Sequence, residues 1–324
     1  MRRSMLLLLL AVPGSLANVS SASDRVVTDP LILSAIMTAA RGDLAHLELT
    51  YVVNRVDIEN SRQMPKQHYH VAWAENGFRV QVLTLGEEAN RPFDDDILRQ
   101  YDAVAGEGLM FDGVADAYVS TVPSLLGLSE AMPEMVGVLG VFPMRTLCGE
   151  ANLKTDPIEL LGSGNAVVAP NFVTVNGVQC VAVSLLDPST SPMTLRATGY
   201  YAPSLGYAQV RMDVFSEPDG RPLGRWEMLD WIDRGPDSVA LPLSARHTRW
   251  TDGDVAGVID MTIEGTGGQR AIDTIDGLNL QFDLPAGTAV HNYDTGKVTI
   301  VSVLHRESPF ATAGVARTPA MYSS

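Results

Sequence analysis

The sequence has few cysteines, a deficit of positive charge and no long apolar run after its first residues. Its 324 residues include 23 Lys and Arg against 38 Asp and Glu, a net charge of −15 that opposes binding to nucleic acid or to anionic membrane surfaces. The two cysteines form no CxxC pair and have no nearby His pair, which argues against a cysteine metal site. Beyond the start of the chain, no stretch approaches the roughly 20 apolar residues of a membrane helix. We expect no nucleic-acid partner and no membrane span.

Motifs that carry catalysis are also lacking. The sequence contains no H-E-x-x-H, no P-loop and no G-x-G-x-x-G. "GLSEA", residues 127–131, lacks the last Gly of a nucleophile elbow and the strand that should precede it. "DGD", residues 252–254, lacks the remaining ligands of a calcium loop and is better explained as a hairpin turn. We therefore predict no catalytic, cofactor-binding or metal-binding residues and a protein that is not an enzyme.

The first 22 residues have the layout of a secretory signal peptide. Two arginines precede an apolar run that ends at Pro13-Gly14, and small residues offer cleavage after Ala17 or Ala22. No cysteine follows the run, so no lipid-attachment signal is present. A buried core helix is the alternative, but the order of charge, apolar run and small residues favours export to the periplasm or the extracellular space. Export permits a disulfide between Cys148 and Cys180, and the spacing leaves two free buried thiols equally open.

A helix and a run of alternating strands are expected next. Asp29 as N-cap, Pro30 in the first turn and Gly42 as the stop predict an amphipathic helix. The apolar residues of "AHLELTYVV", residues 45–53, recur at every second position, as they do in "QHYHVAW", residues 67–73. Asn76-Gly77 is a strong hairpin signal.

If Asn76 and Gly77 are the two turn residues of that hairpin, a specific register follows. Glu75 then pairs with Phe78, Trp73 with Val80 and Val71 with Val82, with the apolar side chains on one side.

The rest of the chain alternates between loops, short helices and further strands. Residues 91–100 are predicted to be a connection, residues 101–119 to hold one or two strands, and residues 121–163 to form a helical insertion. Strands with a second Asn-Gly turn follow from residue 171, and residues 264–279 are predicted to be a loop. The Ser-, Thr-, Pro- and Ala-rich tail from residue 307 to 324 is predicted to be disordered.

The fold class that these patterns indicate is β-rich α+β. The strands alternate, which is typical of an antiparallel meander with one packed and one solvated face, here on a few helices. Large aromatic residues in such strands pack a core or line an apolar pocket. The candidates for a cavity lining are Tyr69, Trp73, Phe78, Trp226 and Trp231.

His46, His68 and His70 are predicted on the polar face of the first two strands. His68 and His70 share a face, but His46 lies at the far end of the first strand, so a three-histidine metal site is not expected.

The sequence resembles the lipoprotein-sorting proteins of the LolA/LppX-like type. The start "DPLILSAIMTAARGDLAHLELTY" and the late "FDLPAGTAVHNYDTG" also resemble a group of secreted bacterial proteins assigned to that fold. The resemblance covers most of residues 28–305 and implies a single domain, an incomplete antiparallel barrel over helices with a concave apolar cavity. Characterised relatives carry lipoprotein acyl chains or other lipids, and the present chain is far longer than the short carriers.

Two functions follow as hypotheses. The first is a non-enzymatic binding or carrier protein for a hydrophobic ligand, a lipid or a lipoprotein acyl chain, with no cofactor. The second is a structural or interaction protein of the cell envelope whose cavity is filled. The late stretch "DLPAGTAVHNYDTG", residues 283–296, places Asp294 three residues from His291, but no nucleophile lies nearby, so we predict the edge of a final hairpin rather than a catalytic site.

Overall fold

The computed structural model describes most of the chain between residues 26 and 301. Its described ranges are 26–64, 66–85, 97–112, 115–126, 157–187, 193–216, 220–234, 238–264, 272–275, 277–280 and 284–301. The predicted signal peptide, Cys148, "GLSEA" and the tail from residue 307 lie outside the described residues. The predicted helical insertion is described only at its two ends.

Helices make up a small part of the described fold. Two α-helices are α1 (Pro30–Ala40) and α4 (Pro157–Gly162), and short 3-10 turns are η1 (Gly42–Ala45), η2 (Pro123–Leu126) and η4 (Pro203–Leu205). The strands of the N-terminal half are β1 (Leu47–Asp57), β2 (Arg62–Gln63), β3 (Lys66–Ala74), β4 (Gly77–Leu85), β5 (Ile97–Asp102), β6 (Glu107–Phe111) and β7 (Asp116–Ser120). Those of the C-terminal half are β8 (Ala166–Val168), β9 (Val173–Val175), β10 (Val178–Asp187), β11 (Thr194–Ala202), β12 (Ala208–Phe215), β13 (Pro222–Ile232), β14 (Leu241–Thr251), β15 (Asp254–Ile263), β16 (Ile272–Thr274), β17 (Ala289–Asn292) and β18 (Lys297–Ile300).

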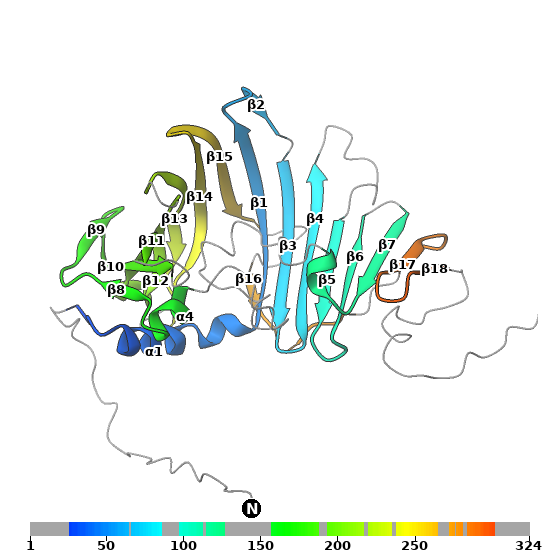
Figure 1. The fold of residues 1–324 in the computed structure, drawn as a ribbon, viewed down its shortest axis with the longest axis horizontal. Coiled ribbons are helices and arrows are strands. Elements are labelled where there is room, and N and C mark those ends of the chain that lie inside the picture. The colour runs from blue at the N-terminus through cyan, green and yellow to red at the C-terminus, as the bar shows by residue number, and fades with distance from the viewer. Residues whose placement is uncertain are drawn as a thin grey trace, which may run out of the picture.

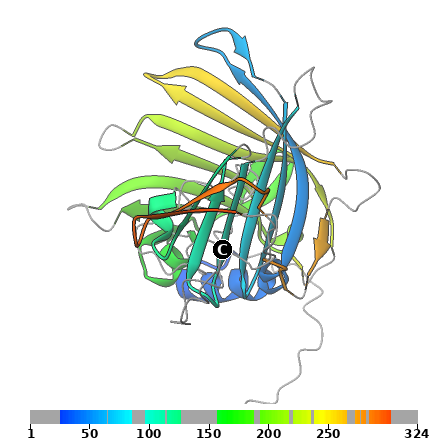
Figure 2. The same cartoon turned by 90° about the vertical axis from the view of Figure 1, so that its right-hand side faces the viewer.

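Strand β1 joins two meanders into one curved sheet. On one edge it pairs with β3, and β4, β5, β6 and β7 follow in order. On its other edge it pairs with β15, and β14, β13, β12, β11 and β10 follow. We call the β3–β7 side, with β17 and β18, the first wing and the β8–β15 side the second wing (Figure 1). The sheet curls without closing on itself, as Figure 2 shows, so the predicted open β-rich fold on a few helices is confirmed.

Helix α1 forms as its sequence predicts. The Asp29 carboxylate accepts hydrogen bonds from the backbone N–H of Leu31 (2.9 Å) and Ile32 (3.2 Å), and Pro30 occupies the first helical position. The buried face of the helix packs with α4 on strands β8, β10, β11 and β12. The residues of this cluster include Leu33, Met37, Leu160, Leu161, Val181, Val183, Tyr201 and Met212. The two helices therefore cover the far end of the second wing (Figure 1).

The two Asn-Gly pairs behave differently. At Asn176-Gly177 both residues have positive φ, +50° and +80°, and Val175 pairs directly with Val178, which is a two-residue hairpin turn of the expected kind. At Asn76-Gly77 the turn residues are instead Glu75 and Asn76, since Ala74 pairs with Gly77.

The predicted β3–β4 register is consequently wrong by two residues. Trp73 pairs with Phe78 and Val71 with Val80. A shift of two leaves each side chain on its predicted face.

Contacts from outside the hairpin explain the shift. A Cβ on Gly77 would lie 2.1 Å from the carbonyl oxygen of Tyr101 on β5, so only glycine allows that strand to approach. The Asn76 side chain donates to the Leu278 carbonyl (2.8 Å) and accepts from the Leu278 N–H (3.0 Å). Gly77 therefore allows β5 to pack closely, and Asn76 holds the segment around Leu278, in addition to the part that Asn76 plays in the turn.

Three further expectations are corrected. Residues 97–100, predicted to belong to a connection, form part of β5, and β16 lies within the predicted loop 264–279. The meander is not wholly antiparallel, because β17 runs parallel to β7, with His291 opposite Tyr118. These pairings bring together segments far apart in sequence, so local pattern gives no sign of them.

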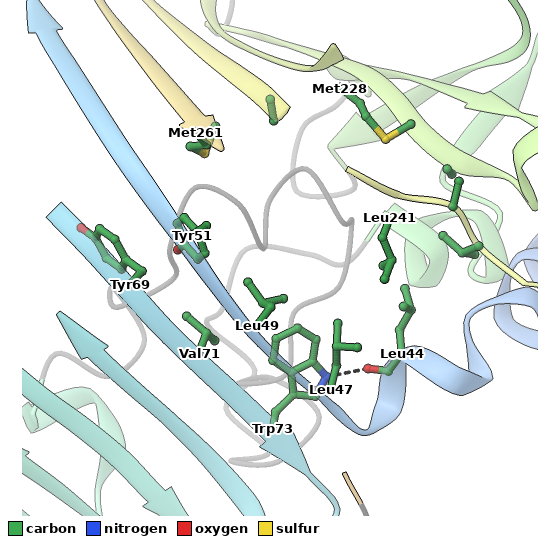
Figure 3. Packing of buried hydrophobic residues seen from close by; sticks show 14 of the residues in the cluster. Leu44, Leu47, Leu49, Tyr51, Tyr69, Val71, Trp73, Met228, Leu241 and Met261 are labelled. Carbon is green, nitrogen blue, oxygen red and sulfur yellow. Dashed lines mark hydrogen bonds between the residues drawn. The ribbon is translucent and has the colours of Figure 1, made fainter. Parts of the chain in front are cut away.

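The main core lies on the face of the sheet that both wings share, which we call the inner face. Tyr51, Tyr69 and Trp73 of β1 and β3 are buried in one cluster with Met228 and Met261 of the second wing. Figure 3 shows these side chains gathered between the two wings. Tyr51 and Tyr69 stack with ring centroids 5.1 Å apart, and the Trp73 indole N–H donates to the Leu44 carbonyl at 2.6 Å.

The opposite, outer face of the first wing is buried as well. Leu98, Leu109 and Val119 form a separate cluster with Leu284, which belongs to the segment that precedes β17. Gln100 is fully buried there and donates to the Leu280 carbonyl at 2.9 Å. The prediction of one packed and one solvated face is therefore wrong for the first wing, because a distant segment covers its second face.

Candidate ligand-binding face

The inner face is apolar over its middle and polar at one end. The pairings between β13 and β1 are continuous here, so side chains opposite one another form rows across the strands. One row contains Met228, Ala245, Met261 and Val53, and the next contains Trp226, His247, Ile259 and Arg55. The third row contains Gly224, Arg249, Gly257 and Asp57. On β14 the inner face thus changes from the buried Ala245 to the cation Arg249 over three rows, and on β1 it changes from the buried Val53 to Arg55 over two.

All five predicted lining aromatics belong to this face or pack against its core. Tyr69, Trp73 and Phe78 are buried members of the main cluster, and Phe78 stacks on Tyr101 with centroids 6.2 Å apart. Trp226 and Trp231 pack against the same cluster but remain partly exposed. The structure therefore brings the five together, with the first three in the core and the two tryptophans at its margin. That they line a cavity stays a prediction.

Arg55 lies beside the tyrosine pair on β1. One guanidinium nitrogen donates to the Tyr69 hydroxyl at 2.7 Å and another donates to Gln67 Oε1. The Arg55 Cζ lies 5.8 Å from the centroid of the Tyr69 ring. These contacts fix a cation on the same face as the apolar core.

His247 and Trp226 form a stacked pair on β14 and β13. Their ring centroids are 4.2 Å apart with an interplanar angle of 7°. Burial, reinforced by the charge of Arg249, lowers the pKa of His247 to about 4, so the imidazole is neutral at physiological pH. Its Nδ1 has no hydrogen-bond partner among the described residues.

Arg249 lies one row beyond this pair, between two glycines. Gly224 on β13 and Gly257 on β15 are its direct cross-strand neighbours, and neither carries a side chain that could cover it. Gly224 also makes room for the stack, since a Cβ there would lie 3.3 Å from His247 Nε2. Arg249 is exposed. The two glycines thus leave a flat surface with a cation at its centre.

The histidines of the first strands make pairwise contacts rather than a metal site. His70 Nε2 lies 2.6 Å from Glu48 Oε1, and His46 Nε2 lies 3.9 Å from Glu75 Oε1. His68 lies opposite Val52, on the same outer face as His70. Within the described ranges, no group of three or more His, Cys, Asp and Glu side chains is placed to hold a metal ion.

The closing stretch forms the predicted hairpin, with different partners from those considered in the sequence. His291 Nε2 lies 2.7 Å from Asp116 Oδ1 on β7, and its ring stacks on Tyr118 at 5.0 Å. Asp294 instead accepts from the Ser120 hydroxyl and the Thr121 N–H, both at 2.7 Å. His291 and Asp294 therefore each bind β7 or its end, which fastens the hairpin to the first wing.

Cys180 lies in the main core. Its thiol is buried, and burial raises the pKa of the thiol to about 11, so it is not a reactive thiolate. Cys148 lies outside the described residues, and the disulfide stays a prediction.

Arg55 and Arg249 are not among the candidate site residues that the sequence pattern indicated. The sequence does contain a signal for Arg55: counted in steps of two from Leu47, it is the first charged residue on the buried face of β1. Arg249 follows Ala245 and His247 by the same count on β14. The sequence alone does not show that these two strands lie on either side of β15.

Comparisons of the structure find weak similarity to several solved structures, among them a LolA superfamily protein, a putative lipoprotein-sorting protein domain and LprF. A LolA superfamily protein of Nitrosomonas europaea matches with 10% identity and a TM-score of 0.41, over 73% of this chain and 91% of that one. A putative outer membrane lipoprotein-sorting protein domain of Vibrio parahaemolyticus matches with 10% identity and a TM-score of 0.43, over 78% and 94%. LprF of Mycobacterium bovis matches with 12% identity and a TM-score of 0.22, over 75% and 96%.

The first two descriptions name the class that the sequence resembles. Similarity at this level carries no inference about function. No protein-family model matches the sequence, and neither does any curated protein sequence. None of the described helices is long and apolar enough to cross a membrane.

Proposed function

We propose that this protein is an exported, non-enzymatic binding or carrier protein for a hydrophobic ligand, such as a lipid or a lipoprotein acyl chain. The observation that carries the proposal is the inner face, where both wings contribute to one apolar cluster across β1. Apolar side chains at its margin stay partly exposed and are available to a ligand. They include Val82, Met110, Trp226, Trp231 and Ile263.

The aromatic and methionine content of this face suits an apolar ligand of variable shape. Methionine adapts its packing, and large aromatics supply contact area at low conformational cost. The outer face of the second wing differs, since it carries charged pairs such as Arg246 with Asp260 at 2.6 Å. A hydrophobic ligand would therefore bind to the inner face of these strands rather than to their outer face.

Native mass spectrometry and lipid extraction test the proposal directly. The full chain, expressed with its own leader and purified from the periplasm of the host, should retain lipid-sized adducts. The purified protein should also take up the neutral apolar dye N-phenyl-1-naphthylamine, with an increase in dye fluorescence. Absence of both adducts and dye uptake would contradict a carrier.

A pair of tryptophan variants localises the site. Trp226→Ala removes an aromatic ring from the inner face, and roughly tenfold weaker dye binding is expected from the lost contact area. Trp250→Ala is the matched control, because Trp250 lies on the next strand under the Arg225 guanidinium, on the outer face. Equal effects of the two variants would count against the inner face.

The second candidate function is that of a structural or interaction protein of the envelope, whose inner face is filled by its own side chains and binds no ligand. The observation that favours it is the close packing of Trp73 and Phe78, both at most 3% exposed. In that case neither lipid nor dye should bind, and the Trp226→Ala variant should lose stability only.

A further inference from the structure

We infer that the ligand is an anionic amphiphile whose head group binds at Arg249 and Arg55 and whose chain lies against the partly exposed apolar side chains of the inner face. This inference rests on the proposed function and names the chemical class of its ligand. A carboxylate and a phosphate monoester share the chemistry that two guanidinium groups recognise.

The three rows supply both halves of such a site. The row of Met228, Ala245, Met261 and Val53 is apolar but at most 1% exposed, so the chain contacts the partly exposed Trp226 and Ile263 in the rows on either side of it. The row of Gly224, Arg249, Gly257 and Asp57 contains an exposed cation. Successive rows on one strand are two residues apart, about 7 Å, so the distance from Ile263 to Gly257 is about 20 Å. A chain of about sixteen carbons spans that distance.

The middle row provides the transition. Trp226 and His247 stack flat against each other, and Arg55 lies in the same row beyond Ile259. The neutral His247 adds no charge to this row, and its Nδ1 is buried away from a head group. Aromatic side chains with one polar end suit the boundary between a chain and its head group.

Charge in the surroundings makes the cations selective. The chain as a whole carries −15, yet Asp57 is the carboxylate that faces Arg249 in its row. Asp57 accepts from the Asn60 N–H at 3.0 Å and from the Asn60 side chain at 2.8 Å, but its charge also interacts with Arg249, so it competes with an anion for that cation. An anion is attracted to this end of the inner face because its last two rows contain two guanidinium groups, Arg55 and Arg249, and one carboxylate, Asp57.

A third cation on the inner face lies apart from this site. Arg99 of β5 is opposite Val80, which is opposite Val71 and then Leu49 on β1. It therefore belongs to the first wing, three strands from β1, and offers a competing location for a head group.

Two fluorescent ligands with the same chain test the inference. Parinaric acid is ionised at pH 8, and its methyl ester is neutral. The wild-type chain should bind the acid about fivefold more tightly than the ester at low salt, and the difference should shrink in 1 M salt. Equal binding of acid and ester would overturn the head-group inference and leave the carrier proposal standing, whereas binding of neither would overturn both.

Variants assign the head group. Arg249→Gln should weaken binding of the acid about fivefold and leave the ester unchanged, and Arg249→Lys should restore most of the difference. Asp57→Asn should strengthen binding of the acid, because it removes a competing carboxylate. Arg246→Gln is the matched control, since it removes the same charge from the outer face of the same strand.

If Arg246→Gln or Arg99→Gln lowers the acid preference as much as Arg249→Gln does, the assigned site is wrong. Displacement of parinaric acid by hexadecanoate and by hexadecyl phosphate distinguishes the two sources of the anion. Either displacement supports the inference, and the tighter competitor identifies the head group. Failure of both to compete, with the ester still bound, would overturn it.

Discussion

The two wings of the sheet bury their strands in different ways. In the second wing the outer face stays a polar surface, where Asp213 accepts from Arg211 and Arg225 and Arg246 pairs with Asp260. In the first wing the outer face is covered by the segment before β17, which buries Leu98, Leu109 and Gln100. Alternation of apolar and polar residues is therefore clear in the second wing and blurred in the first. The difference shows that within one sheet the strands of one half can have a solvated outer face, while a distant segment of the same chain buries both faces of the other half.

The largest effect should come from Gly77→Ala in the first wing. The added Cβ would lie 2.1 Å from the Tyr101 carbonyl oxygen, at a backbone φ of +152° that side chains rarely adopt. We expect a loss of more than about 3 kcal/mol in the free energy of unfolding, measured by urea denaturation.

Gly253→Ala is the counterpart in the second wing. This glycine also has positive φ, +95°, but nothing lies within 4 Å of its added Cβ. About 1 kcal/mol is expected there. Equal losses for the two glycines would mean that close packing between β4 and β5 does not distinguish the wings.

Glu107 should make the stability of the first wing depend on pH. Its side chain is 1% exposed, neither carboxylate oxygen has a hydrogen-bond partner among the described residues, and Asp294 and Asp102 lie near it. Burial, followed by these two negative charges, raises the pKa of Glu107 from 4.5 to about 7.

The folded state thus keeps a proton that the unfolded state releases between pH 4.5 and 7. Stability should fall as pH rises through that window, by roughly 2–3 kcal/mol, and level off above it. Glu107→Gln should remove this fall and be the more stable protein at pH 8, as measured by urea denaturation at several pH values. A variant that keeps the full pH dependence would show that another group is responsible.

Asp213→Asn should have a moderate effect on the second wing. Asp213 is largely buried and forms charge-assisted bonds with Arg211 and Arg225, both of which the substitution would leave without their carboxylate. We expect a loss of about 1–2 kcal/mol, because both arginines keep some access to water.

Arg246→Gln should have the smallest effect of the series. The Arg246–Asp260 pair is exposed, so a loss of at most about 0.5 kcal/mol in urea denaturation is expected. A larger loss than for Asp213→Asn would contradict the assignment of the polar surface to solvent.

Much of the fold could be predicted where neighbours in sequence are neighbours in space. The N-cap Asp29, the hairpin at Asn176-Gly177 and the turn at Asp252-Gly253 follow local backbone preferences, and the structure confirms them. Asn76-Gly77 has the same sequence as the turn of the confirmed hairpin, but its residues contact β5 and Leu278. The observed β3–β4 register therefore differs from the predicted one by two residues.

The candidate site divides in the same way. The faces of Tyr69, Trp73, Phe78 and Trp226 follow from a period of two, which the sequence displays. Arg55 and Arg249 reach adjacent rows of one face because β15 pairs with both β1 and β14, and the β1–β15 pairing joins residues about 200 apart in sequence. His291 likewise contacts the carboxylate of Asp116, 175 residues away in sequence, and not that of Asp294, three residues away.

By itself the sequence determined the first helix and most of the described strands, the sides on which their apolar residues lie and the excess of negative charge, because these depend on local geometry and composition. The tertiary structure alone decided which strands meet, that β17 joins β7 in parallel, and that two cations stand at the end of an apolar face. The physical reason is that strand pairing between distant segments is selected by the burial of whole faces, and no single window of sequence contains both partners.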